Sequence, residues 1–224
     1  MNKLSKRLEM VAELVPNGTN CADIGADHGY LIMNLFQSRK IISGYACENK
    51  KGPFERLKTN IENNSLRDNI LVELSDGIRT IPDYIDTVII AGMGGDTVCK
   101  IITDSIDKLE QIDYFIISSH TKMDEVRKLL MHFNYSIIEE NSCFDANQYY
   151  EGALFKKGKA NYSYIELKYG PELLKTKNCN TLKYLLEKYK FNQNLIKNDK
   201  LPISRIEDIK IENLELDSVI KLLK

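Results

Sequence analysis

Carboxylates and glycines recur in this 224-residue sequence at points where an apolar run ends. Asp23 and Asp27 flank a glycine turn after the first run, Glu48 ends the second, and Asp76 follows the third. Carboxylates attract cations and accept hydrogen bonds from hydroxyl and amino groups, while glycine lets a ligand approach the backbone closely. These residues predict a pocket for a polar, nucleotide-like ligand that carries positive charge.

The elements that position these residues follow from the apolar pattern. Runs of β-branched and apolar residues predict strands, and longer patterns with helical spacing lie between most of them. The predicted strands are 20–24, 42–47, 70–74, 87–91 and 114–118, and the predicted helices are 30–40, 53–63, 96–109 and 124–133. Two further strands, 135–139 and 150–156, follow with no helix between them, which favours an antiparallel pair at the sheet edge. The sequence therefore predicts an α/β fold with a doubly wound, Rossmann-like sheet.

The last third of the chain has a different character. Ser163 and Glu166 predict a capping box for a short helix that a Gly-Pro pair interrupts. Two amphipathic patterns follow, separated by Pro202, and they favour a coiled-coil-like α-helical hairpin. Packing of the same helices on the sheet is an open alternative. We expect two domains, residues 1–159 and residues 160–224.

Composition and charge narrow the classes of protein. With 43% hydrophobic and 28% charged residues, wholesale disorder is excluded. No apolar run reaches the roughly 20 residues that a membrane-spanning helix needs, and the start lacks the apolar core of a secretion signal. We therefore expect a cytoplasmic protein with no membrane contact and no obligate protein partner. The five cysteines and three histidines are scattered, so no metal site is expected.

The charge is unevenly distributed along the chain. Residues 156–224 hold 15 Lys and Arg against 9 Asp and Glu, whereas residues 1–155 hold 16 against 23. Phosphates attract lysines whatever the base sequence, so a basic tail favours a nucleic-acid partner. A solvated helical face would carry the same charges, and charge alone leaves the two interpretations even.

The glycine turn after the first predicted strand lies where a doubly wound sheet binds nucleotide-like ligands. Its spacing is not GxGxxG, and Asp23 and Asp27 would repel a pyrophosphate but attract the ammonium and sulfonium groups of S-adenosylmethionine. We expect Glu48 to accept hydrogen bonds from both ribose hydroxyls and Asp76 to accept one from the adenine amino group. The predicted cofactor-binding residues are Asp23, Gly25, Asp27, His28, Glu48, Asn49, Ser75, Asp76, Gly77, Gly92 and Met93.

Three glycines in four residues follow the fourth predicted strand, at Gly92, Gly94 and Gly95. They predict an open backbone wall on which a planar base can lie beside the methyl donor. A tight turn into a helix would explain one or two of them.

Taken together, these stretches resemble the bacterial TrmK family, the tRNA (adenine-22-N1)-methyltransferases. The sequences ADHGYL at 26–31 and AGMGG at 91–95 carry the resemblance, with SKRL at 5–8 near the start, and it extends over the whole chain. The chain departs from the family at Ile32, where a proline is usual, and at 118–120, where Ser-Ser-His replaces a Gln-Pro-Asn-like stretch. The resemblance implies a class I methyltransferase sheet, S-adenosyl-L-methionine as the cofactor and tRNA as the substrate.

The expected acceptor is a ring nitrogen of adenine. The stretch after the fourth strand lacks the Asn/Asp-Pro-Pro-aromatic sequence that grips an exocyclic amine, and a ring nitrogen with a lone pair needs no base. The candidate catalytic residues are Asp27 and His28, to orient the adenine or take up charge, and Tyr30, to stack on it. Each has a simpler alternative role, shaping the pocket or starting the helix. The predicted substrate-binding residues are Lys3, Lys6, Arg7, Gly94, Gly95, Lys183, Lys188 and Lys190.

Three other functions compete with this interpretation. A methyltransferase of a protein or small metabolite would need the same cofactor residues. An RNA-binding module that retains the cofactor without turnover is disfavoured by the intact set Asp23, Gly25, Glu48 and Asp76. A nicotinamide oxidoreductase is disfavoured by the missing GxGxxG spacing.

Overall fold

The computed structural model describes residues 3–197 and 201–224 of the chain. The chain divides into two compact units, Met1–Asn161 and Tyr162–Lys224. This boundary lies two residues beyond the one expected from the sequence, and each unit is described by itself.

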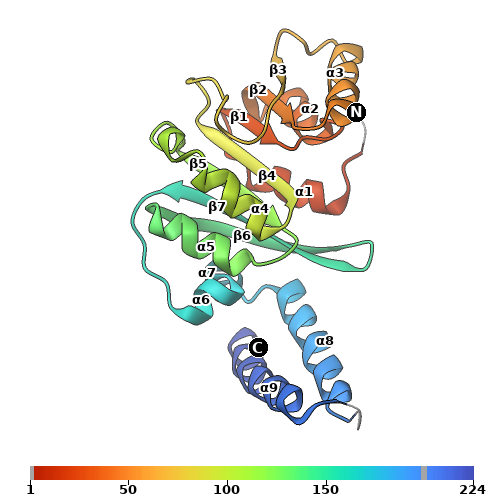
Figure 1. Ribbon diagram of the computed structural model, residues 1–224, viewed down its shortest axis with the longest axis vertical. Helices are drawn as coiled ribbons and strands as arrows, with labels where there is room; N and C mark the ends of the chain where they lie inside the picture. Colours follow the sequence, from red (N-terminus) through yellow and green to blue (C-terminus); the bar gives the residue numbers. More distant parts are fainter. Residues whose placement is uncertain (1–2, 198–200) are drawn as a thin grey trace. The chain divides into compact units, whose positions relative to one another are not determined.

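The larger unit alternates strands with helices (Figure 1). Its strands are β1 (Thr19–Ile24), β2 (Ile41–Glu48), β3 (Ile70–Leu74), β4 (Thr87–Met93), β5 (Tyr114–Ser119), β6 (Tyr135–Asp145) and β7 (Gln148–Lys157). Its helices are α1 (Lys6–Leu14), α2 (Tyr30–Gln37), α3 (Lys51–Asn63), α4 (Gly95–Thr103), the 3-10 turn η1 (Ile106–Lys108) and α5 (Met123–His132). The strands form one sheet in the order β3-β2-β1-β4-β5-β7-β6.

The topology confirms the doubly wound sheet. Strands β1 to β5 run parallel to one another, and β7 pairs antiparallel with both β5 and β6. The predicted antiparallel edge pair is therefore confirmed, with longer strands than the sequence indicated. Helices α1, α2 and α3 share an apolar core on one face, while α4 and α5 pack against each other on the other (Figure 1).

One expectation about the helices was wrong, and one helix was not predicted. The predicted helix 96–109 ends at Thr103, and only a 3-10 turn follows it. The carbonyl of Asp104, which a continued helix would use, accepts a hydrogen bond from Nε of Arg79 at 2.7 Å instead. Helix α1 was not anticipated, although the Ser5 side chain caps it by accepting a hydrogen bond from the backbone N–H of Leu8.

The order of the strands creates a switch point. From β1 the chain continues outward on one side through β2 and β3, and on the other side through β4 and β5. The loops after β1 and β4 therefore diverge at the carboxyl edge of the sheet, which is where open α/β sheets bind ligands.

The smaller unit is helical, with α6 (Tyr164–Tyr169), α7 (Pro171–Lys175), α8 (Cys179–Leu195) and α9 (Ile203–Leu223). The capping box at Ser163 and Glu166 is confirmed, since both of its hydrogen bonds are present. Helices α8 and α9 run antiparallel and contact each other, which confirms the helical pair. They share an apolar cluster, formed by Tyr169, Leu185, Leu216, Val219, Ile220 and Leu223. The coiled-coil geometry expected for this helical pair stays a prediction.

Candidate functional site

A cavity of about 190 Å³ lies at the switch point, and we call it the switch-point cavity. Its lining comes from β1, β2, β4, the loop after β3 and the first turns of α4. Eight of the predicted cofactor residues line it: Gly25, Glu48, Asn49, Ser75, Asp76, Gly77, Gly92 and Met93. Residues far apart in the sequence are thus brought to one place, while their roles stay predictions.

The loop from β1 to α2 is anchored to β2 by backbone hydrogen bonds. The N–H groups of Gly25 and Ala26 donate to the carbonyl of Cys47 at 3.0 and 3.1 Å. The N–H of Asp27 donates to Oε1 of Glu48 at 2.6 Å, and Asp27 adopts a positive φ of 49° to do so. The Glu48 side chain is therefore fixed in direction, with a carboxylate held at the edge of the switch-point cavity.

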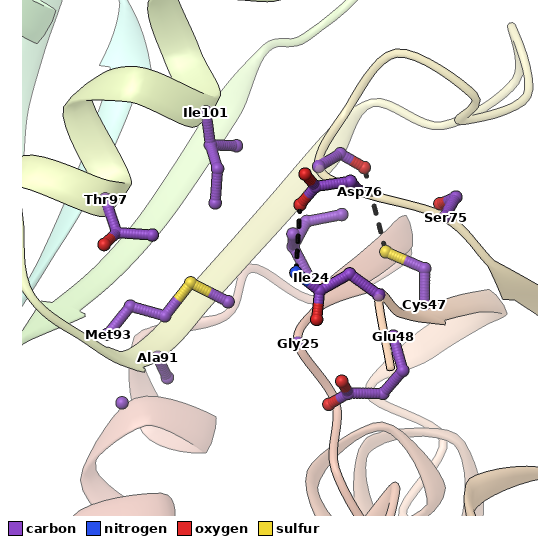
Figure 2. Close-up of a pocket in the computed structure, with 13 residues that line it drawn as sticks. Ile24, Gly25, Cys47, Glu48, Ser75, Asp76, Ala91, Met93, Thr97 and Ile101 are labelled. Atoms are coloured by element: carbon purple, nitrogen blue, oxygen red, sulfur yellow. Dashed lines mark hydrogen bonds between the residues drawn. The ribbon is translucent and has the colours of Figure 1, made fainter. Parts of the chain in front are cut away.

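The loop after β3 forms a second polar edge. Nδ2 of Asn49 donates to Oδ1 of Asp76 at 3.3 Å, and Sγ of Cys47 donates to the carbonyl of Gly77 at 3.7 Å. Figure 2 shows Cys47, Ser75 and Asp76 on one side of the cavity, opposite Thr97 and Ile101. The carboxylates and the apolar wall thus face each other across the space.

Thr97 and Ile101 on α4 were missed by the sequence analysis. Their spacing of four residues places both on one face of the helix, and that spacing is the signal that could have identified them. Gly77 adopts a φ of 86°, which favours glycine, and a Cβ there would be in ordinary contact with Cγ2 of Ile101 at 3.4 Å. The predicted helix contained both residues, but the direction in which they face follows only from the fold.

Asp23 lies outside the lining of the switch-point cavity, contrary to its expected place beside the ligand. It is buried in β1, with 4% of its surface exposed. Burial, followed by the neighbouring Glu48 carboxylate, raises the pKa of Asp23 to about 7, and the charge of Arg7 opposes this rise. The first acid of the motif is therefore a buried group with a pKa near neutral pH, and its contact with the ligand stays a prediction.

The candidate catalytic residues after β1 form an exposed cluster outside the cavity lining. Oδ2 of Asp27 lies 3.7 Å from Nε2 of His28, and Oδ1 lies 3.9 Å from Nη2 of Arg56. The His28 and Tyr30 rings stack with centroids 5.3 Å apart and an angle of 7° between their planes. The structure therefore places these side chains together, outside the lining of the switch-point cavity.

The three glycines around the end of β4, Gly92, Gly94 and Gly95, have three different surroundings. A Cβ at Gly94 would lie 3.4 Å from Oγ1 of Thr121, which is ordinary contact, so this position is open. A Cβ at Gly95 would lie 2.5 Å from the carbonyl oxygen of Thr121. The expected open wall is therefore wrong for Gly95, which is buried because the loop after β5 packs against its backbone.

Gly92 adopts a φ of 89°, which favours glycine, and a Cβ there would lie 3.0 Å from Nη1 of Arg7. Met93 covers Gly25, since its methyl group occupies the space that a side chain at residue 25 would need. Figure 2 shows the Met93 thioether reaching toward Gly25 from β4. A flexible thioether can move aside for a ligand at low cost.

The predicted phosphate-binding cations also have distinct surroundings. Lys3 and Lys6 are exposed, as are Lys183 and Lys190 of α8. Nζ of Lys188 lies 2.7 Å from Oε1 of Glu212, so this lysine joins α8 to α9. Lys188 therefore has a structural role in the helical pair that the sequence did not indicate.

Comparison with known proteins defines first a class and then a family. A family model described as a methyltransferase domain matches residues 4–152, so the chain is a methyltransferase by class. The tRNA (adenine(22)-N(1))-methyltransferase of Bacillus subtilis is 32% identical over 200 residues, which cover 86% of this chain and 84% of that protein. The chain belongs to this tRNA (adenine-22-N1)-methyltransferase family, TrmK.

Solved structures agree with this assignment. The crystal structure of the B. subtilis m1A22 tRNA methyltransferase TrmK superposes with a TM-score of 0.80 at 29% identity, covering 100% of this chain and 98% of that one. The structure of M. capricolum TrmK, in complex with the cofactor product S-adenosylhomocysteine, superposes with a TM-score of 0.86 at 27% identity and covers 99% of both chains. The similarity therefore includes both units of the chain.

Two further observations concern membranes and metals. Across residues 3–197 and 201–224, no helix is long and apolar enough to cross a membrane. The same residues contain no group of three or more His, Cys, Asp or Glu side chains placed to hold a metal ion.

Proposed function

We propose that this enzyme transfers the methyl group of S-adenosylmethionine to N1 of adenine 22 in tRNA. The observation that carries the proposal is the convergence of Glu48, Asn49, Asp76 and the glycine-rich end of β4 on one cavity at the switch point. A relative with 32% identity over most of its length has this activity by name. The cofactor supplies an electrophilic methyl group on a sulfonium sulfur.

The residues around the switch-point cavity fit such a cofactor. We expect the Glu48 carboxylate, fixed by the N–H of Asp27, to accept hydrogen bonds from the two ribose hydroxyls. We expect Asp76, oriented by the Asn49 amide, to accept one from the adenine amino group. Thr97 and Ile101 offer an apolar surface for the adenine ring across from these acids.

The acceptor base is expected beside Gly94, the open position at the end of β4. Two aromatic pairs lie at the carboxyl edge of the sheet: His28 with Tyr30 after β1, and His120, after β5, with Tyr150 of β7. The backbone N–H of His120 donates to the carbonyl of Met93 at 3.0 Å, which ties the second pair to the end of β4. Because N1 of adenine has its own lone pair, these residues need only hold the base in line with the methyl group.

The tRNA partner, the cytoplasmic location and the domain roles stay proposals. Exposed lysines of α8 support contact with phosphates, since Lys183 and Lys190 both lie on the surface of that helix. Lys3 and Lys6 provide exposed positive charge at the start of the larger unit.

The test is methylation of defined tRNA transcripts with labelled S-adenosylmethionine, followed by nucleoside analysis. We expect 1-methyladenosine from a transcript with adenine at position 22 and none from the same transcript with guanine there. Formation of N6-methyladenosine, or labelling of protein instead of RNA, would contradict the proposal. Binding of the cofactor without any turnover on tRNA would favour the RNA-binding module.

A further inference from the structure

Both long helices of the smaller unit line a further space, which we call the hairpin groove. Its volume is about 580 Å³, a size typical of ligand sites. The residues that α9 contributes recur at intervals of three and four, so they lie on one face of that helix. The lining includes Tyr189 of α8, Ile196 and Lys197 just after it, and Lys210, Asn213 and Leu214 of α9.

The α9 side of the hairpin groove combines an exposed apolar side chain with an unpaired amide. Leu214 leaves 73% of its surface exposed. Asn213 is only 9% exposed, and its Oδ1 atom has no hydrogen-bond partner among the described residues. A buried acceptor without a partner destabilises the fold, so an occupant that pairs with this amide would remove a cost. Rotation about χ2 exchanges Oδ1 and Nδ2, and the amide can therefore present an acceptor or a donor.

The α8 side adds a planar ring with a polar end. The Tyr189 hydroxyl accepts a hydrogen bond from Nε2 of Gln193 at 2.9 Å, which leaves its own hydrogen to donate. With Ile196 and Leu214, the groove thus offers apolar surface interrupted by hydrogen-bonding groups. A nucleobase has the matching surfaces, since its faces stack on side chains and its edge carries donors and acceptors.

The charges of the lining favour an anionic occupant. Lys197 and Lys210 are exposed, and neither has an ion-pair partner among the described residues. The acid of the lining, Asp217, lies 2.6 Å from Nζ of Lys221 and is already paired. Unpaired positive charge beside an apolar space fits a nucleotide, with its base in the groove and its phosphates at the lysines. An uncharged apolar peptide would leave both lysines without a role.

We propose that the hairpin groove binds one unpaired base of the tRNA. Asn213 recognises the edge of the base, Leu214 and Tyr189 contact its ring, and the two lysines hold the adjoining phosphates. The inference rests on the proposed function, which supplies tRNA as the partner. It adds a contact to a base to the phosphate contacts expected of α8, and unpaired bases are the parts of a folded RNA that side chains can read.

The main test is a matched pair of substitutions of exposed leucines on α9. Leu214 lines the groove, whereas Leu222, with 59% of its surface exposed, does not. Filter binding of a tRNA transcript in the presence of S-adenosylhomocysteine measures affinity across a salt series for the full-length wild type, Leu214→Ser and Leu222→Ser. We expect Leu214→Ser to weaken binding about five- to a hundredfold, the range for one lost base contact, with the salt slope unchanged. Leu222→Ser should bind as wild type does.

Asn213→Leu removes the amide and keeps the size of the side chain. Because Oδ1 of Asn213 has no partner, we expect the melting temperature not to fall. Affinity for tRNA should fall about two- to tenfold, as for one lost neutral hydrogen bond. A purely structural asparagine would not separate the two measurements in this way. Lys210→Ala, in contrast, should reduce the salt slope by about 1, as expected for a phosphate contact.

Chemical probing of the bound tRNA identifies the base. Dimethyl sulfate and a carbodiimide modify the pairing edges of unpaired bases, and both report protection by the protein. We expect wild type to protect one base besides adenine 22. That base should become reactive in the complex with Leu214→Ser and stay protected in the complex with Leu222→Ser.

Four results would overturn the inference. Equal affinities of Leu214→Ser and Leu222→Ser for tRNA would show that no RNA enters the groove. A reduced salt slope in Leu214→Ser, with no base losing protection, would leave only phosphates there. Unchanged affinity in Asn213→Leu would remove the recognition of a base edge. Self-association of wild type that Leu214→Ser abolishes in sedimentation would give the groove to a second copy of the chain.

Failure of the proposed function gives a different result. It appears as absent methylation at adenine 22, whereas every measurement on the hairpin groove reports binding or protection. A wild type that binds tRNA without methylating it would still show the difference between Leu214→Ser and Leu222→Ser if the groove holds a base.

Discussion

The two walls of the switch-point cavity are built by opposite means. One, the carboxylate wall, consists of Glu48, Asn49 and Asp76; the other, the glycine wall, is the segment 92–94, of which Gly92 and Met93 line the cavity. We expect the side chains of the carboxylate wall to contact the cofactor themselves. The glycine wall leaves space, and Arg7 from a distant helix supplies the charge beside it. The side chains of the carboxylate wall can therefore be predicted from the sequence. The groups that lie beside the glycine wall come from other segments and follow only from the fold.

The strongest test of the glycine wall is Gly94→Val. Gly94 has an ordinary backbone conformation, with φ at −74°, and a Cβ there fits against Thr121, so we expect the protein to fold. A branched side chain would stand where the adenine must lie, and misplacing a reacting group by about 1 Å costs on the order of a hundredfold in rate. We therefore expect turnover to fall at least a hundredfold while affinity for S-adenosylhomocysteine changes little.

Gly94→Ala is the matched control, because its single methyl group contacts Oγ1 of Thr121 at 3.4 Å without reaching further. We expect it to retain much of the activity. Parallel measurement of rate and cofactor affinity decides the point: equal losses of both in Gly94→Val would show that the glycine wall serves the cofactor and not the base.

Beneath the carboxylate wall, Asp23 should make stability depend on pH. Its pKa in the folded protein is about 7, above the ordinary value of 3.8, so folding favours the protonated form. Protonation of Asp23 therefore stabilises the folded protein fully below pH 4. This stabilisation decreases as the pH rises from 4 to 7 and does not change further above pH 7. Asp23→Asn keeps a neutral side chain, and its stability relative to wild type should increase between pH 4 and 7 by up to about 4 kcal/mol.

Denaturant unfolding of both proteins at several pH values measures this difference. All other titrating groups are the same in both proteins. The difference between their free energies of unfolding at each pH therefore reports the contribution of Asp23 alone. A constant difference across this range would show that Asp23 is ionised throughout, with Arg7 outweighing the effects of burial and Glu48.

The carboxylate wall is tested directly by Glu48→Ala. Removing a charged hydrogen-bond partner typically costs about 1.5–3 kcal/mol, so we expect calorimetry to show cofactor affinity at least tenfold weaker. Glu48→Gln is the control, because it keeps an oxygen that can accept from the N–H of Asp27. An affinity that is unchanged in Glu48→Ala would remove the ribose assignment, and equal losses in both variants would place the effect in the charge itself.

The features that could be predicted from the sequence belong mostly to the carboxylate wall, and those that could not belong mostly to the glycine wall. The strands β1 to β5 and the acids at their ends were predicted from apolar runs and residue type, and the structure brings Glu48 and Asp76 to one cavity. The burial of Gly95 depends on the loop after β5, and the inward position of Arg7 depends on a helix packed against β6 and β7. These contacts join segments more than twenty residues apart, and local patterns carry no information about them.

The break after Thr103 shows the same limit at a smaller scale. The helical pattern continues through Leu109, but the Arg79 side chain takes the carbonyl of Asp104. The helix thus ends where a side chain from another loop binds the backbone carbonyl of Asp104, although the local sequence favoured continuation.

The helical unit should give the smallest effect, because its contribution to tRNA binding rests on exposed charge. We expect Lys183→Glu combined with Lys190→Glu to weaken tRNA binding and to reduce the slope of log affinity against log salt by about 1 for each phosphate that a lysine no longer neutralises. Lys188 is left intact, since its pairing with Glu212 at 2.7 Å holds α8 to α9 and its reversal would test folding instead. Cofactor affinity should be unchanged.

The matched control makes the same charge change elsewhere, with Lys58→Glu and Lys128→Glu on exposed positions of α3 and α5. Filter binding of tRNA across a salt series compares the two double variants at equal net charge. If α8 binds phosphates, its variant loses affinity and slope while the control keeps more of both. Equal effects would assign the change to the overall charge of the protein. An unaltered slope in the α8 variant would favour the other interpretation of the basic charges. In that interpretation they form a solvated helical face, and the helices only pack around their shared apolar cluster.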